Sequence, residues 1–531
     1  MARNQYFAKK PLAAVDREIE GDDRLHRVLG PWQLVSLGVG ATIGAGIFVM
    51  VGEAAATKAG PSLMLSFIVA GIACGFAAFC YAEFASMVPI AGSAYTYAYT
   101  TLGELMAWII GWDLVLEYAV SSAAVAQGWS KYFQDLLGVV RVGGKPLMLP
   151  ESIRNAPFEF NGEQGRFVTT GSWIDLPALL ITGLLTWVLI RGIRASARFN
   201  TLMVVIKVAV VLLVIVVGAC YINPANWTPF APYGYSGISF FGQPILGTTS
   251  TRGEPLGMMA GAAIIFFAYI GFDAVSTHAE EARNPRRDVP FGIIGSLVVC
   301  TALYIGVTAV LTGMVPYDQI DRHAPVSAAF GHVGQTWIQA FVSLGAITGI
   351  TSVLLVTMLS QPRVLLAMAR DGLLPISFFG AVHPHYRTPW KSTLLTGLVV
   401  GLLGSLLPLD VLADLVSIGT LLAFVIVCGA VLVMRHVAPD APRPFRVPFG
   451  PVFPVLGILT CLLLMFSLPL ENWWRLGGWL AVGLVIYFGY GRHHSHLARN
   501  LLREETQEGL SPPASRFPHG GAPPGDSKSQ P

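Results

Sequence analysis

Ionisable residues inside apolar runs are the positions where this sequence is best able to do chemistry. Lys207 stands alone in the run TLMVVIKVAVVLLVIVVGA. A charge at the centre of a bilayer costs about 2.5–3.5 kcal/mol on insertion scales, so such a residue is rarely accidental. A buried lysine changes its protonation state readily, which suits a group that takes up and releases a proton. The alternative is that Lys207 lies about two helical turns from one end of its run and extends its amine to the membrane surface.

Three acidic residues also interrupt apolar runs. Asp113 and Glu117 stand four positions apart, so a helix would place both carboxylates on one face. Glu117 is expected either to line a polar route or to act as a polar anchor between helices, and the sequence leaves both readings open. Asp273 stands two residues after Gly271 and is expected to bond to local backbone groups in preference to titrating.

The elements that must position these residues are membrane-spanning helices. Only 12% of the 531 residues are charged and 53% are hydrophobic, whereas soluble proteins are about 25% charged. Runs of about 17–25 apolar residues, long enough to cross a bilayer, recur about twelve times. We therefore predict an all-α polytopic membrane protein. The expected spans are Trp32–Ala55, Ser62–Val88, Glu104–Tyr132, Leu176–Leu189, Leu202–Tyr221, Leu256–Thr277, Phe291–Val315, Trp337–Met368, Thr393–Leu407, Val411–Met434, Val452–Leu470 and Trp474–Tyr490.

The distribution of lysine and arginine predicts the orientation. Basic residues gather in segment 1–30 and in the loops after the fourth, sixth, eighth and tenth spans. This distribution predicts that both termini are cytoplasmic and that the protein lies in the cell membrane. The long loop between the third and fourth spans is also basic, but long loops cross regardless of charge. Segment 1–30 is expected to be a cytoplasmic N-terminal segment, and residues 499–531, rich in Ser, Pro and Gly, a disordered cytoplasmic tail.

Two of the predicted spans contain breaks in corresponding positions. The first span contains GVGATIGAGIF, and the sixth contains FFAYIGFD. Each break frees backbone groups, which are tolerated in a membrane only where protein or a polar ligand satisfies them. Paired breaks indicate an inverted-repeat transporter with its site at mid-membrane, although glycines also serve close helix packing. We predict one repeat at 31–222, a second at 256–434 and two further spans at 450–491.

The breaks supply two poles of opposite polarity for a zwitterionic ligand. Amides at the start of the resumed helix would receive a carboxylate, and freed carbonyl groups would accept from an ammonium group. The amides are those near Ala45, Gly46 and Ile47, and the carbonyls are those near Ile43, Phe267, Ala268 and Ile270.

Four runs carry a family resemblance that covers roughly Arg24 to Tyr490. They are GATIGAGIFV, LEYAVSSAAVAQGWS, FFAYIGFDAVSTHAEEARNPRRDVP and RVLLAMARDGLLP. With these runs the chain resembles the amino acid–polyamine–organocation (APC) superfamily, specifically its cationic-amino-acid-transporter-like (CAT-like) branch. The resemblance implies a five-plus-five inverted-repeat (LeuT-like) fold with two additional C-terminal helices. The total of about twelve spans looks like the bacterial form, since vertebrate members typically have two more spans. Because the chain differs from the vertebrate members in this respect, their strict selectivity for cationic substrates does not transfer securely to it.

The same resemblance implies roles for individual residues. The substrate carboxylate would meet the amides after Ile43, beginning with Gly44, and the amino group would meet carbonyls at Ile43 and from Phe267 to Ile270. Phe267 matches the aromatic residue that covers the bound substrate. In proton-coupled relatives a lysine at the position of Lys207 lies where sodium-coupled relatives hold a cation.

The resulting hypothesis is an amino acid/proton symporter, with an amino acid/amine exchanger on the same fold as the alternative. No cofactor and no metal are expected, the proton gradient is the expected energy source, and an accessory small membrane subunit is left open. The net charge of +3 is dispersed, which argues against nucleic-acid binding. The apolar spans contain neither a HExxH nor a GxSxG motif, which argues against an enzyme. Candidates for side-chain selectivity are Ser121, Ser122, Thr351, Ser352 and Ser417.

Overall fold

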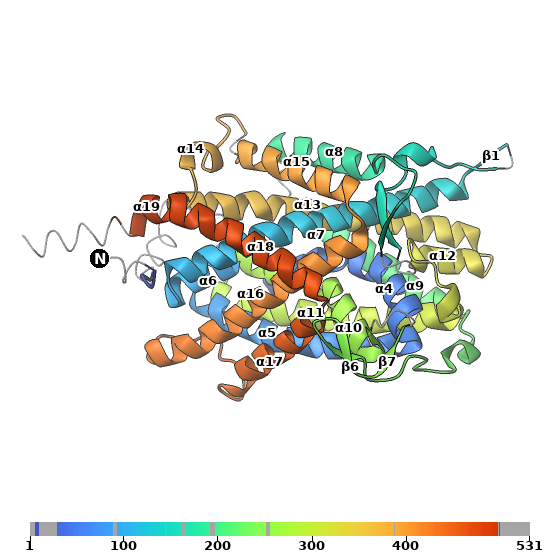
Figure 1. The fold of residues 1–531 in the computed structure, drawn as a ribbon, viewed down its shortest axis with the longest axis horizontal. Coiled ribbons are helices and arrows are strands. Elements are labelled where there is room, and N and C mark those ends of the chain that lie inside the picture. The colour runs from blue at the N-terminus through green and yellow to red at the C-terminus, as the bar shows by residue number, and fades with distance from the viewer. Residues whose placement is uncertain are drawn as a thin grey trace, which may run out of the picture.

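The computed structural model describes residues 6–9, 29–88, 93–143, 145–161, 166–191, 197–250, 255–386, 388–497 and 499. The predicted N-terminal segment 1–30 and tail 499–531 lie almost entirely outside these residues. Most of the helices run along the long axis of the molecule (Figure 1). The N-terminus and α19 lie at one end, which we call the termini face, and β1 lies at the other, which we call the hairpin face.

Helices account for most of the described chain, as the apolar runs predict. In chain order they are α3 (Pro31–Thr42), η1 (Gly46–Met50), α4 (Val51–Ala54), η2 (Ala55–Ala59), η3 (Gly60–Ser62), α5 (Leu63–Met87), α6 (Ser93–Thr101), α7 (Glu104–Val139), η4 (Glu151–Ile153), α8 (Leu176–Arg191), α9 (Ala197–Ala219), η5 (Pro224–Trp227), α10 (Met258–Ile265), η6 (Phe266–Tyr269), η7 (Phe272–Glu281), α11 (Pro285–Met314), η8 (Tyr317–Gln319), α12 (Pro325–His332), α13 (Thr336–Arg370), α14 (Ile376–Phe379), α15 (Trp390–Leu406), α16 (Leu409–Val437), α17 (Val452–Ser467), α18 (Leu470–Ile486), η9 (Tyr487–Gly491) and α19 (Arg492–His494).

Several of these helices can cross a membrane by length and composition. Within the described residues there are seven, or eight if α17 and the helix Leu470–His494, bent by 110°, form one span. Two shorter apolar helices, α8 and α15, lie beside them. The region Gly46–Met87 counts once although it covers parts of two predicted spans, because its helical backbone continues through a turn at Gly60. The all-α polytopic fold is thus confirmed, and the number twelve stays a prediction, as do the boundaries of the two repeats.

Within the described part of the chain, four small antiparallel hairpins connect helices, and the sequence did not predict them. Strands of two to four residues are too short to show a period, and glycines such as Gly143 (φ 62°) and Gly242 (φ 75°) make their turns. The pairs are β1 (Arg141–Val142) with β2 (Lys145–Pro146), β3 (Phe158–Asn161) with β4 (Arg166–Thr169), β5 (Ile238–Phe240) with β6 (Gln243–Leu246), and β7 (Thr248–Thr249) with β8 (Pro255–Leu256).

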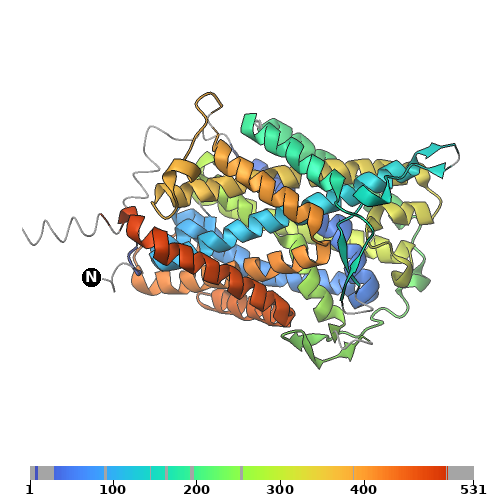
Figure 2. The same cartoon turned by 45° about the horizontal axis from the view of Figure 1, so that its top comes forward.

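The helix α7 crosses the centre of the molecule, where helices from both halves of the chain surround it (Figure 2). Twenty-three of its residues are buried, so it is hydrophobic or small on nearly every side, as a central span must be. The helices α13 and α16 pack against it. This arrangement places Glu117, in the middle of α7, at the centre of the membrane domain.

A buried ion cluster closes the termini face. The carboxylate of Glu83, near the end of α5, accepts hydrogen bonds from Nε and Nη2 of Arg435 at 3.2 and 2.6 Å and from the Val447 amide at 2.7 Å. Arg443 lies 3.6 Å from the same carboxylate and donates to carbonyls at the end of α16. The cluster therefore fixes the loop after α16 against α5.

We expect Glu83→Gln to lower the stability of the folded protein by about 3 kcal/mol, because it leaves two guanidinium groups without their carboxylate. The side chains of Glu83, Arg435 and Arg443 are only 2%, 21% and 6% exposed. The matched control is Glu53→Gln, whose pair with Arg322 is 37% and 60% exposed, so its effect should stay below about 1 kcal/mol. Melting temperatures in detergent measure both, and equal effects would contradict the assigned role of burial.

Candidate functional site

The first break lies between α3 and η1. The helix α3 ends at Thr42, and Ile43 is extended (ψ 99°), before a helical stretch resumes at Gly46 and continues to Ala59. The first amides of a helix have no acceptor within that helix. The amides that open this second stretch therefore point back into the break, as the sequence predicts for Ala45, Gly46 and Ile47.

The second break lies between η6 and η7. Gly271 takes a left-handed conformation (φ 113°), which a glycine adopts without steric cost. Its α-carbon faces the first break, since a Cβ added there would lie 2.6 Å from the Ala41 carbonyl oxygen. At Gly46 an added Cβ would lie 2.3 Å from the α-carbon of Ala268. The glycines therefore allow the two breaks to pack directly against each other.

Two side chains donate hydrogen bonds to carbonyl groups that the breaks expose. The hydroxyl of Tyr304, in α11, donates to the carbonyls of Thr42 at 3.0 Å and Ala268 at 2.8 Å. The amine of Lys207, in α9, donates to the carbonyls of Gly40 at 2.6 Å and Ile43 at 3.2 Å. A carbonyl oxygen can accept two hydrogen bonds, so these contacts leave capacity for a further donor.

Lys207 is fully buried and points toward the break, not toward the membrane surface. Among the described residues, no carboxylate lies within ion-pair distance of its amine. Its position joins α9 to the end of α3, beside the predicted substrate site.

A small cavity lies between the two breaks, α7 and α13. It leaves about 20 Å³ for the centres of water molecules, enough for roughly one water. Of the predicted substrate residues, Gly44, Ala45, Gly46, Phe267 and Ile270 line it. Ile43, Ile47 and Ala268 do not line it, although they belong to the same breaks. The conformation is therefore one in which the site is closed around very little space.

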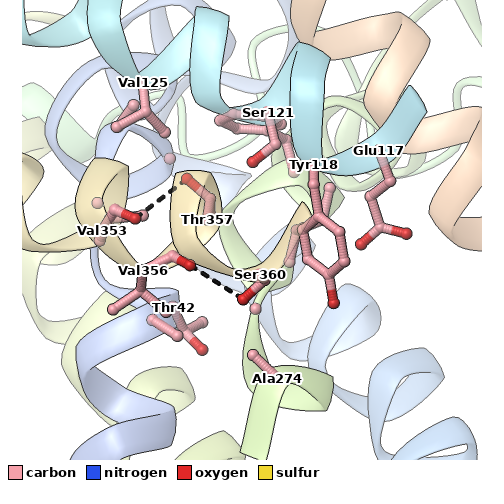
Figure 3. A pocket seen from close by; sticks show the side chains of 17 residues that line it. Thr42, Glu117, Tyr118, Ser121, Val125, Ala274, Val353, Val356, Thr357 and Ser360 are labelled. Carbon is pink, nitrogen blue, oxygen red and sulfur yellow. Dashed lines mark hydrogen bonds between the residues drawn. The ribbon is translucent and has the colours of Figure 1, made fainter. Parts of the chain in front are cut away.

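The cavity has one apolar and one polar end (Figure 3). Val125 of α7 and Val353 of α13 lie at one end, and Glu117 and Tyr118 of α7 with Ser360 of α13 lie toward the other. Residues 117, 121 and 125 are each one helical turn apart, so they form a stripe along α7. A ligand in this space would contact both kinds of surface.

Sequence reasoning missed much of the cavity wall. The lining residues that it did not name are Ala41, Thr42, Tyr118, Val125, Ala274, Val353, Val356, Thr357 and Ser360, whereas Gly271 was expected as part of the second break. The spacing of Val353, Thr357 and Ser360 on one helix face was the available signal, but valine at helical spacing is ordinary packing. Of the selectivity candidates, Ser121 lines the cavity and Ser122 donates to Thr357 at 2.8 Å. Thr351, Ser352 and Ser417 do not line it.

The buried acids lie along this polar end. Glu117 lines the cavity and its Oε1 has no hydrogen-bond partner, and neither oxygen of Asp113 has one, among the described residues. Amides of Gly271 and Ala274 interact with the Asp273 carboxylate, but its Oδ1 has no hydrogen-bond partner among the described residues, so the structural role of Asp273 stays a prediction. A buried acceptor without a donor is costly, so the Glu117 oxygen favours a water or a ligand group that donates a hydrogen bond.

The charged segment that follows η7 connects the two broken helices at the termini face. The Leu29 amide donates to Glu281, and the Arg283 amide donates to Leu29, at 2.9 and 2.8 Å. The bonds join the residues just before α3 to those just after η7. From the sequence, the charged residues of this segment could form either a cytoplasmic gate network or a charged helix end. These residues are Glu280, Glu281, Arg283, Arg286 and Arg287.

Paired broken helices around a buried cavity define a membrane transporter, and comparison with known proteins assigns the family. The amino acid permease family model matches residues 29–487. The chain belongs to this family, which is part of the APC superfamily, and it is a transporter and not an enzyme. The predicted superfamily is thus confirmed.

The names of the relatives indicate different substrates. The chain is 46% identical to the branched-chain amino acid permease BcaP of Bacillus subtilis, over 93% of this chain and 99% of the relative. It is 45% identical to the methylthioribose transporter of the same organism, over 92% and 99%. It is 40% identical to the vacuolar cationic amino acid transporter 2 of Arabidopsis thaliana, over 78% and 61%.

We expect Gly46→Ala to cost about 1–3 kcal/mol of stability and to reduce uptake, because its methyl group would overlap Ala268 where the breaks meet. Gly429→Ala in α16 is the matched control, since an added Cβ meets nothing within 4 Å. That control should be neutral or slightly stabilising. A Gly46→Ala protein that melts and transports like the parent would contradict the close approach of the two breaks.

Proposed function

We propose that this chain is an amino acid/proton symporter that works by alternating access. The substrate backbone is held at the two breaks, and Lys207 is the proton-coupling group. The observation that carries the proposal is the position of the Lys207 amine, buried without a carboxylate partner and hydrogen-bonded to Gly40 and Ile43.

The two breaks support recognition of a zwitterion. The amides that open the helical stretch at Gly46 carry the positive end of a helix dipole, which favours a carboxylate. The carbonyls of Ile43, Ala268 and Ile270 are acceptors for an ammonium group. Phe267 lines the cavity beside them. Backbone recognition of this kind does not depend on the substrate side chain, which agrees with relatives named for branched-chain and for cationic amino acids. Methylthioribose, which another relative is named for, carries neither pole, so that name does not support zwitterion recognition.

The proposed coupling between the proton and the substrate depends on one carbonyl group that accepts hydrogen bonds from both Lys207 and the substrate. The Ile43 carbonyl accepts from Lys207 and is also a proposed ligand of the substrate ammonium. A protonated Lys207 donates three hydrogen bonds, and a neutral one donates two and gains an acceptor. Loss of the proton therefore changes the donors around the end of α3, which alters both the geometry of the break and the affinity for the substrate.

The direction of transport depends on orientation. We propose that the termini face is cytoplasmic, in the cell membrane, because basic loop residues such as Arg283, Arg370 and Arg435 belong to it. An inward proton gradient would then drive amino acids into the cell.

Uptake by sealed liposomes tests the coupling. We expect labelled alanine to accumulate faster under an inward proton gradient in the parent, and Lys207→Ala to lose this stimulation because no titratable amine remains at the break. Lys145→Ala, an exposed lysine of β2, should keep the stimulation. Exchange against internal alanine and the melting temperature show that the Lys207 variant is folded.

The exchanger is the alternative outcome of the same experiment. If uptake by the parent ignores the gradient but requires amino acid inside the liposome, the protein exchanges substrates and Lys207 is not a coupling group. A retained gradient response in Lys207→Ala would likewise refute its role.

A second prediction tests the cavity as the substrate site. Ala274→Leu should abolish uptake, because three additional carbons exceed a space of about 20 Å³. Ala219→Leu, on the exposed surface of α9, is the matched control and should transport normally. A panel of alanine, valine, arginine and methylthioribose identifies the substrate class. Undiminished uptake by Ala274→Leu would place the substrate elsewhere.

A further inference from the structure

The helices α8 and α15 form one edge of the membrane domain. They lie side by side along one margin of the molecule (Figures 1 and 2). Thr186 contacts Gly397 and Leu179 contacts Gly401, so the two helices pack closely. The helix α15 has 17 residues, with both ends inside the described part of the chain, which correspond to about 26 Å of helix, whereas the hydrocarbon core of a bilayer is about 30 Å thick.

The outer surface of this pair is apolar along its length. Leucines on both helices are exposed, and tryptophans stand near each end of α8, namely Trp173 on the hairpin side and Trp187 near the termini face. Tryptophan favours the boundary between lipid tails and headgroups. The exposed leucines are Leu180, Leu184, Leu394, Leu398 and Leu402. At α15 this edge therefore offers lipid an apolar helix shorter than the ordinary thickness of a bilayer.

Two cations lie where the edge ends at the termini face. The guanidinium of Arg191 lies 4.1 Å from the centroid of the Trp187 ring, which is 52% exposed. The amine of Lys391 lies 5.8 Å from the rings of Phe378 and of Trp390. The hydroxyl of Thr388 donates to the Ile190 carbonyl at 2.8 Å, so the start of α15 adjoins the end of α8.

Neither cation forms an ion pair with a carboxylate in the described part of the chain. Beside them the short helix α14 exposes Ile376 and Phe378. Apolar side chains next to unpaired cations are typical of a surface that meets lipid headgroups.

We propose that Arg191 and Lys391 form a binding site for the phosphate of an anionic phospholipid. A helix shorter than the bilayer draws headgroups inward, which brings phosphate groups to the level of these two cations. Aromatic rings lie beside both cations, and the Lys391 amine also donates to the Ser377 carbonyl at 3.3 Å. The headgroup phosphate would supply the negative charge that no described carboxylate gives these cations. The site is independent of the transport cavity and of the substrate.

Native mass spectrometry of the full chain in detergent tests the site. The probes are phosphatidylglycerol and phosphatidylcholine with identical acyl chains. We expect the parent to retain phosphatidylglycerol preferentially. The double variant Arg191→Gln with Lys391→Gln should bind it about 30-fold more weakly, which corresponds to about 2 kcal/mol for two charges.

The matched control removes two exposed cations from the hairpin side, Lys145→Gln with Arg322→Gln, and should bind phosphatidylglycerol like the parent. The variant Arg191→Lys retains the positive charge and should keep most of the phosphatidylglycerol binding. It shows that lost binding in the double variant comes from the lost charge and not from misfolding. Equal retention of the two lipids by the parent, or unchanged binding by the double variant, would overturn the proposal. A dimer that only the double variant loses would also overturn it and assign the edge to a second copy of the chain.

Discussion

Unpaired backbone groups inside a membrane are the constraint on which this structure depends. A helix that breaks in lipid must find new partners for its amides and carbonyls, and here two helices break at the same depth. Tyr304 and Lys207 donate to four of the exposed carbonyls. The glycines let each break approach the other. The surrounding helices are arranged so that these few side chains reach the centre.

The sequence predicted this centre because its signals are strong and local. Glycines near a polar residue inside an apolar run indicate a break, and a lone lysine in such a run indicates either a buried role or an amine that reaches the membrane surface. Lys207 indeed meets the break, although its partners could not be read from spacing alone. The resemblance of four runs to a transporter superfamily led us to expect an APC-type transporter, and the family comparison agrees with that expectation.

What the sequence did not predict depends on contacts between distant helices. Tyr304 lies in an apolar run, where an aromatic residue is ordinary core, and only the packing of α11 brings its hydroxyl to Thr42 and Ala268. The wall contributed by α13 was missed for the same reason, since valine and threonine at helical spacing carry no functional signal. The ion cluster of Glu83 joins residues more than 350 positions apart, a distance that local patterns do not cover.

The small size of the cavity has a consequence for the membrane itself. Protons travel along chains of hydrogen-bonded water, and a space for roughly one water is too short to be such a chain. In this conformation the cavity therefore offers protons no continuous path of water molecules between the two sides of the membrane. Under the alternating access proposed above, a passage would form only while the helices that surround a substrate move, and copies of the protein at rest would not dissipate a proton gradient.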